Sequence, residues 1–266
     1  LVLRTYPRDY YFAPLGVLGA LACTALPRWV AAALAVLLAA GNVVQLAQPK
    51  ERFPWQEQMG MAGRFLREVV PPGEPVGSFN SGIVAFHDPG PVVNLDGVVH
   101  RAAFEALRAG DLDAWLDRRG IRFLVDSAIQ FAIDGPWPHS SGAHFGAGFA
   151  PTRDLVELAR CVVPGVEQPF VVYHRRGRGA PPPPPEKARV LGPAPAEGGR
   201  RAGAWVLWPA HGPDALALRA ADGSGDSIQL VTVDRPTAVL VRVDAPRPGR
   251  WALVAGDGSE VLALDL

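Results

Sequence analysis

An apolar run from Tyr11 to Leu46 is the feature that most constrains what this chain can fold into. Between its ends, Arg28 is the one residue that carries charge at neutral pH, and it follows Pro27. A membrane-spanning helix needs about 20 apolar residues, so the run is too long for one straight span. We therefore expect two transmembrane helices, over residues 11–26 and 29–46, that turn at the proline.

Two questions about this run stay open at the level of the sequence. Arg28 in the turn favours a cytoplasmic turn and an outer-face tail, whereas Lys50 and Arg52 favour the opposite orientation. The alternative to a membrane hairpin is a pair of buried helices in a large soluble protein. Because the chain begins with Leu1 and reaches the run almost at once, residues 1–49 are expected to be the last two spans of a longer protein.

The overall composition excludes several classes of function. The 26 basic residues balance 26 acidic ones, so no net charge favours nucleic acid as a partner. Cys23 and Cys161 are not expected to pair, and the six histidines lack metal-ligand spacing. Neither a phosphate-binding loop nor a nucleophile elbow is present. We expect no metal, no cofactor and no autonomous enzyme in the part after the apolar run.

Residues 50–176 are predicted to form an extracytoplasmic α/β domain with a small, mainly parallel sheet. Apolar runs bounded by turn residues predict strands over residues 76–79, 92–95 and 121–125. Between the second and third strands, apolar spacing predicts two helices, the first with Phe104 and Leu107 on one face. Gly110 is expected to end that helix and Asp111 to be the N-cap of the next. This alternation of strands and helices is typical of a layer with parallel pairing.

Polar side chains follow these three strands where each one ends. The predicted sheet-edge cluster comprises Asn80, Asn94, Asp96 and Asp126. In a parallel sheet such positions share the carboxyl edge, where open α/β sheets bind ligands. The alternative is that Asn and Asp stand there because they favour turns and caps after strands.

The rest of the chain divides into a linker and a second β-rich region. Residues 177–203 contain Pro181–Pro185 and predict an extended, semi-rigid linker. Short alternating segments in residues 204–266 predict a C-terminal antiparallel β-sandwich. Within it, Gln229, Thr232 and Arg242 stand between apolar neighbours and are expected to be exposed.

Two stretches resemble a known family. Arg8, Tyr11 and Pro14 stand around the start of the apolar run, and Asn94–Val99 (Asn-Leu-Asp-Gly-Val-Val) lies within the strand and helix series from Gly77 to Asp126. Together they resemble the end of bacterial polytopic membrane glycosyltransferases of the C superfamily, which includes protein mannosyltransferase-like and aminoarabinose transferase-like proteins. The resemblance covers about residues 1–130, and the linker and the β-rich tail lie outside it.

The resemblance implies a transferase of the bacterial inner membrane that takes a sugar from a polyprenyl-phosphate carrier on the outer face. Its catalytic acidic residues would lie upstream, so none is assigned here. Arg8 and Tyr11 would contact the carrier phosphate, or else anchor the chain at the membrane interface. The implied partners are membrane lipid, the sugar donor and a lipid, glycan or protein acceptor that the tail holds. The alternative hypothesis is a membrane-anchored envelope binding or assembly protein without transferase activity.

Overall fold

The chain divides into two compact units, Leu1–Glu51 and Arg52–Leu266, and every helix and strand discussed below belongs to the second unit. The computed structural model describes, besides Pro27, Val30, Ala32, Ala33 and Val36, the residues 54–87, 90–133, 141–164, 166–194, 203–222, 224–244 and 248–266.

The prediction of two transmembrane helices is not supported. Among the described residues, no helix is long enough and apolar enough to cross a membrane. The longest helix that the second unit contains, α3 (Pro54–Val69), has 16 residues. At 1.5 Å per residue it spans about 24 Å, less than the roughly 30 Å of a bilayer core, and it carries four charged side chains. Most of the two predicted spans lies outside the described residues, which include only five isolated positions in the apolar run. Arg8 and Tyr11 also lie outside the described residues.

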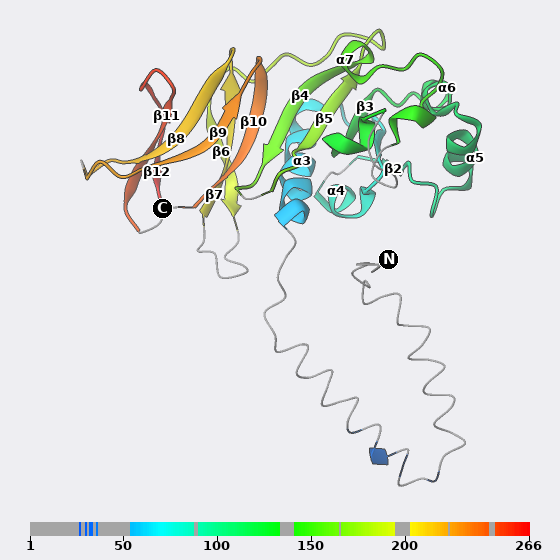
Figure 1. Ribbon diagram of the computed structural model, residues 1–266, viewed down its shortest axis with the longest axis horizontal. Helices are drawn as coiled ribbons and strands as arrows, with labels where there is room; N and C mark the ends of the chain where they lie inside the picture. Colours follow the sequence, from blue (N-terminus) through cyan, green and yellow to red (C-terminus); the bar gives the residue numbers. More distant parts are fainter. Residues whose placement is uncertain are drawn as a thin grey trace. The chain divides into compact units, whose positions relative to one another are not determined.

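The helices and strands of the second unit are short (Figure 1). The helical elements after α3 are α4 (Ser81–His87), α5 (Arg101–Ala109), α6 (Leu112–Arg118), the 3₁₀ turns η2 (Ala128–Phe131) and η3 (Gly142–His144), and α7 (Pro151–Asp154). The strands are β1 (Val76–Ser78), β2 (Val92–Asn94), β3 (Phe123–Ser127), β4 (Leu155–Val162), β5 (Phe170–Arg175), β6 (Arg189–Ala194), β7 (Gly203–Ala210), β8 (Asp214–Ala220), β9 (Ser227–Val233), β10 (Thr237–Val243), β11 (Arg250–Ala255) and β12 (Glu260–Asp265).

One eight-stranded mixed sheet runs through the second unit in the order β2-β1-β3-β5-β4-β10-β7-β6. The three predicted strands of the α/β region are confirmed as β1, β2 and β3, and they pair in parallel. The prediction of a small, mainly parallel sheet is wrong. The sheet continues through antiparallel β5 and β4, then a parallel β4–β10 pair, then antiparallel β7 and β6. The edge of β4 that does not pair with β5 pairs with β10, a strand about 80 residues later in the chain.

The predicted C-terminal β-sandwich is present in part, but it is not an independent module. A four-stranded antiparallel sheet, β12-β11-β8-β9, forms one layer. The other layer consists of β10 and β7 from the large sheet, because Val206, Trp208, Val239 and Val241 share a buried core with Trp251. The segment predicted as a linker contributes strand β6, which pairs with β7.

Alternation along the strands explains how the large sheet is covered on both faces. Trp205 and Leu207 of β7 pack in the core under α3, whereas Val206 and Trp208 point into the sandwich core. On β3, Leu124 packs beneath α5 and α6, while its neighbours Phe123 and Val125 face α3. The central strands are therefore almost wholly apolar, as is usual for strands that are buried on two sides.

Arg242 of β10 is buried, which corrects the prediction that it is exposed. Its side chain is 1% exposed, and it forms ion pairs with Glu57 of α3 at 2.5 Å and with Asp244 at 2.8 Å. The indole N–H of Trp205 donates to the same Glu57 carboxylate at 2.7 Å. These buried polar bonds tie α3 to the sheet. Gln229 and Thr232, by contrast, are exposed as predicted.

Candidate ligand-binding site

The carboxyl edge of the parallel strands brings the predicted sheet-edge cluster together. Because β2, β1 and β3 are adjacent and parallel, their carboxyl ends meet at one edge. Asn94 ends β2, Asp126 is the second-last residue of β3, and Asn80 and Asp96 each stand two residues beyond a strand. Their environments differ, and the differences separate residues that hold the fold from residues that a ligand can reach.

Asp126 is fully buried and its carboxylate accepts four hydrogen bonds. The backbone and side-chain N–H groups of Asn80 donate at 2.7 and 2.8 Å, the Ser127 backbone N–H at 2.7 Å, and the Ser78 hydroxyl at 3.2 Å. Burial raises the pKa of Asp126 to about 6, although each of these donors acts to lower it. With its acceptors occupied, Asp126 joins the ends of β1 and β3 and is not available to a ligand.

Asn94 fixes the neighbouring loop. Its side-chain amide donates to the Phe79 carbonyl at 3.3 Å and to the Ser81 hydroxyl at 3.1 Å. Its Oδ1 atom is buried and accepts no hydrogen bond from the residues that the structure describes. Asn94 therefore holds the β1–α4 connection beside β2.

Asp96 is exposed and lies in a tight turn against α5. Its carboxylate accepts the Val98 backbone N–H at 2.7 Å. The next residue, Gly97, has a φ of +78°, and a Cβ atom there would lie 2.6 Å from the Cβ atom of Phe104. Only glycine fits both the backbone conformation and this close approach. The turn thus places Asp96 beside Phe104.

A pocket of about 380 Å³ opens at this edge, between the strand ends, α5 and the segment after β3. Its apolar side chains are Phe79, Phe104 and Leu107. Its polar side chains are Asn80, Asp96, Arg108, Gln130, Ser141 and His144. Two of the four predicted edge residues, Asn80 and Asp96, therefore line the pocket, whereas Asn94 and Asp126 lie outside its lining.

The aromatic part of the pocket combines a fixed ring with an accessible one. Phe79 is 5% exposed and lies edge-on to Phe131, with ring centroids 6.1 Å apart, and 6.4 Å from the ring of Phe145. Phe104, on α5, is 51% exposed. The sequence already predicted Phe104 and Leu107 on one face of a helix, but that spacing did not show that the face borders a pocket.

The polar part of the pocket offers donors and acceptors of several kinds. Gln130 and Ser141 are bonded to each other, through the backbone at 2.8 Å and the side chains at 3.4 Å. The Nδ1–H of His144 donates to the Leu107 carbonyl at 3.2 Å. Nothing in the local sequence pattern indicated Gln130, Ser141 or His144, because the chain brings them to the edge only by folding back after β3.

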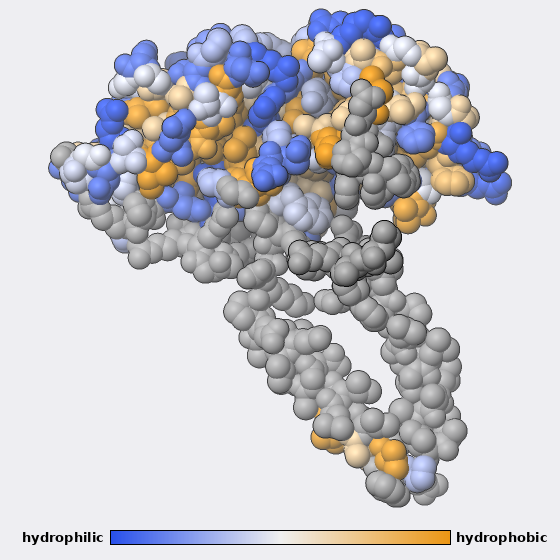
Figure 2. All heavy atoms as spheres, viewed as in Figure 1, coloured by the Kyte–Doolittle hydropathy of each residue, from blue (hydrophilic) through white to orange (hydrophobic). Residues whose placement is uncertain are grey.

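These groups can hold a polar ligand. The exposed carboxylate of Asp96, the guanidinium of Arg108 and the amide of Gln130 come from three different segments and offer charged and neutral hydrogen-bonding groups side by side. Among the described residues, no group of three or more His, Cys, Asp or Glu side chains is placed to hold a metal ion. Over the visible face of the second unit, polar and apolar residues are interspersed (Figure 2).

Residues 47–171 match a family described as "Domain of unknown function (DUF8728)". That segment contains every residue that lines the pocket, together with α3 and the parallel strands. The sandwich lies beyond it. Comparison with curated proteins and with solved structures finds no match to this chain.

Proposed function

We propose that the pocket at the carboxyl edge of β1, β2 and β3 binds a saccharide, and that the second unit holds the acceptor for a bacterial membrane glycosyltransferase. The observation that carries the first part is the lining itself. Two phenylalanine rings stand beside amide, carboxylate, guanidinium, hydroxyl and imidazole groups. Sugars present an apolar C–H face and a rim of hydroxyl groups, which need such a combination of an aromatic surface and mixed hydrogen-bonding groups.

The size of the pocket agrees with this ligand class. An apolar cavity of roughly 150 Å³ admits one six-membered carbon ring. The volume of about 380 Å³ therefore suits one or two pyranose rings. Small-molecule sites of this kind have volumes of roughly 300–1,000 Å³ and a few well-placed polar groups.

The transferase part of the proposal rests on the resemblance around Asn94–Val99. That stretch includes Asp96, which lines the pocket, and Gly97, which positions it against α5. In this proposal the sugar donor is carried on polyprenyl phosphate, the chemistry takes place on residues upstream, and the pocket selects the acceptor. Membrane localisation and an outer-face position of the second unit belong to the same proposal.

Binding is tested on the full chain by saturation-transfer NMR with a panel of monosaccharides and disaccharides. Phe104→Ala removes the accessible ring and is expected to weaken sugar binding at least tenfold. Phe86→Ala is the matched control, because Phe86 is 82% exposed and lies outside the pocket lining. If no sugar gives a signal, or if both variants weaken binding equally, the saccharide assignment is wrong.

Transfer is tested separately, in membranes that contain the complete protein and a radiolabelled polyprenyl-phosphate sugar. Phe104→Ala is expected to raise the KM for the acceptor and to leave the KM for the donor unchanged. Sugar binding without any transfer from such donors would instead favour the second candidate, a non-enzymatic envelope binding protein. The binding pocket is the observation that favours this candidate as well.

A further inference from the structure

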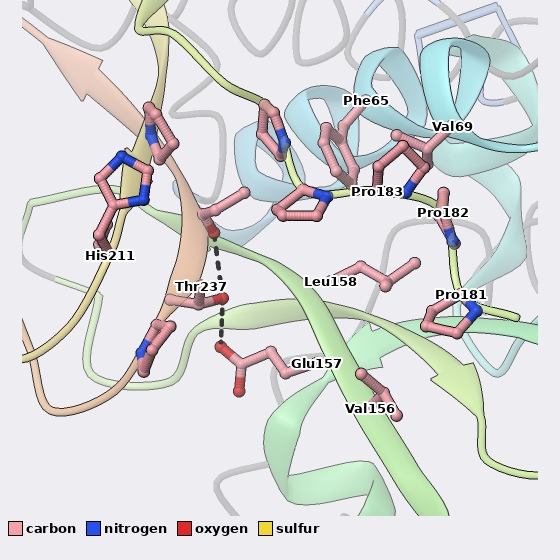
Figure 3. A pocket seen from close by; sticks show the side chains of 16 residues that line it. Phe65, Val69, Val156, Glu157, Leu158, Pro181, Pro182, Pro183, His211 and Thr237 are labelled. Carbon is pink, nitrogen blue, oxygen red and sulfur yellow. Dashed lines mark hydrogen bonds between the residues drawn. The ribbon is translucent and has the colours of Figure 1, made fainter.

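A second pocket lies on the other side of the large sheet from the sandwich core, beneath a strap of five prolines. The strap, Pro181–Pro185, joins β5 to β6 and passes over residues of α3, β4 and β10 (Figure 3). Between the strap and these elements is a space of about 290 Å³. It shares no lining residue with the proposed saccharide site.

The prolines explain why this space stays open. Proline has a fixed φ and no N–H group, so a proline run is extended and semi-rigid and cannot add itself to the sheet as a hydrogen-bonded strand. All five prolines line the space, with Pro182 and Pro185 half-buried and the other three exposed. Beside Pro183, Phe65 and Val69 of α3 belong to the same lining (Figure 3).

A β-bulge supplies the floor. The register of β4 with β5 shifts between Glu157 and Ala159, which leaves Leu158 as an extra residue without a pairing partner on β5. Bulges re-aim side chains and occur often next to functional sites. Here Leu158 extends into the space between β4 and the strap, and it is only half-buried.

One end of the pocket is polar but carries no net charge. The carboxylate of Glu157 is 6% exposed and accepts bonds from Arg160 at 2.9 and 3.0 Å, from Arg235, and from the Thr237 hydroxyl at 3.2 Å. Asp234 supplies a second negative charge close to Arg160. Two carboxylates therefore balance two guanidinium groups.

The hydrogen-bonding groups left at that end are neutral ones. Every carboxylate oxygen of Glu157 already has partners, so it does not attract a cation. The imidazole of the exposed His211 stands at the same end as Thr237 (Figure 3). A hydroxyl group is complementary to such a pair, whereas a carboxylate or phosphate would need a surplus of positive charge.

We propose that the proline-covered pocket binds a neutral amphiphile, an aliphatic chain of about ten carbon atoms with a terminal hydroxyl group. The length follows from the volume. If roughly 150 Å³ of apolar cavity admits six ring carbons, about 290 Å³ admits about ten to twelve. The chain lies between the strap and Leu158, and its hydroxyl group faces Thr237. This inference is independent of the proposed saccharide site.

Photo-crosslinking of the full chain tests the proposal. The probes are diazirine-bearing analogues of decan-1-ol, geraniol and decanoate, each with ten carbon atoms, and mass spectrometry maps the labelled peptides. We expect the alcohols to label the strap and the segment around Leu158, and to do so at least fivefold more than decanoate. Preference for decan-1-ol assigns an unbranched alkyl chain, and preference for geraniol assigns an isoprenoid-type chain.

Leu158→Trp fills the floor of the pocket and is expected to reduce this labelling at least tenfold. Ile228→Trp is the matched control, since Ile228 is a partly exposed aliphatic residue on a strand outside the pocket. If Leu158→Trp does not fold, the double variant Pro182→Gly/Pro183→Gly, which loosens the strap, replaces it with the same expectation. Labelling spread evenly over apolar surfaces, equal labelling by decanoate, or equal effects of test and control variants would overturn the proposal.

Discussion

Replacement of Asp126 by asparagine tests whether the carboxyl group of Asp126 is buried and titrates at the sheet edge. Asp126→Asn keeps the shape of the side chain and removes its titration. The amide oxygen still accepts from the Asn80 side chain and from the Ser127 backbone, as Oδ1 does now. On the other side an NH₂ group faces the Asn80 backbone N–H and cannot accept its hydrogen bond, so the variant loses that bond at every pH. Like the neutral form of Asp126, the variant carries no charge at any pH, and the lost bond adds only a constant to the difference from the wild type.

The magnitude follows from the pKa of this buried carboxyl group. It is about 6 in the folded protein and about 3.9 in an unfolded chain. Between these values the folded state binds more protons than the unfolded state, so the stability that Asp126 contributes is lost as the pH rises. Two pKa units correspond to about 3 kcal/mol, of which about 2 to 3 kcal/mol falls between pH 4 and pH 7.

Urea unfolding followed by tryptophan fluorescence, at several pH values from 4 to 7, measures the effect. The unfolding free energy of the wild type, minus that of Asp126→Asn, is expected to fall by about 2 to 3 kcal/mol over this range. Asp265→Asn is the control, because that side chain is 87% exposed. If the difference in unfolding free energy between the wild type and Asp126→Asn does not change with pH, burial does not raise the pKa of Asp126, and the prediction is wrong.

Three further predictions concern the fold around the two sites. Gly97→Ala is expected to lower the unfolding free energy by about 1–3 kcal/mol, because it combines a φ of +78° with a clash against Phe104, and thermal unfolding measures the loss. Arg242→Met leaves Glu57 buried without its charge partner and is expected to cost about 3–5 kcal/mol in urea unfolding. Burial, with the charge of Arg122 adding to it, lowers the pKa of His174, so stability is expected to fall as the pH drops below about 6.5, and His174→Phe should remove that dependence.

Each of these predictions has its own control. Gly212→Ala is the control for Gly97→Ala and is expected to leave the unfolding free energy almost unchanged, since a Cβ atom there meets nothing within 4 Å. For the buried ion pair, Glu57→Gln combined with Arg242→Met should recover part of the loss, because the uncompensated charge is gone. A double variant no more stable than Arg242→Met alone would contradict this explanation. An unchanged pH profile in His174→Phe would exclude the buried histidine as the source.

Local patterns in the sequence predicted the elements that depend on neighbours along the chain. Apolar runs that end at turn residues located β1, β2 and β3. Gly110 ends α5 in the left-handed conformation, as its position predicted. Asp111 is the N-cap residue of α6, as predicted, but its side chain bonds Arg118 and makes no hydrogen bond to the first turn of α6. A cap depends on side-chain geometry as well as on position.

Predictions that depended on distant parts of the chain failed more often. The alternation around Arg242 indicated an exposed position, since a half-buried strand was assumed. In the folded unit β10 is a central strand with covered faces on both sides, and Glu57 and Asp244 supply the charges that allow the arginine to be buried. Likewise, the proline run forms one wall of a pocket and leads into β6, where only a linker was expected.

The sequence by itself therefore determined that polar residues stand at the carboxyl ends of three parallel strands, because strand periodicity and turn chemistry are local properties. Only the tertiary structure decided what each of them does. Asp126 is surrounded by four donors and fixes the fold, whereas Asp96 remains exposed at a pocket that Phe104 and His144 complete. The burial of a side chain, and whether it lines a pocket, depend on which distant segments pack together in the folded protein. The residues that neighbour it in the sequence do not contain that information.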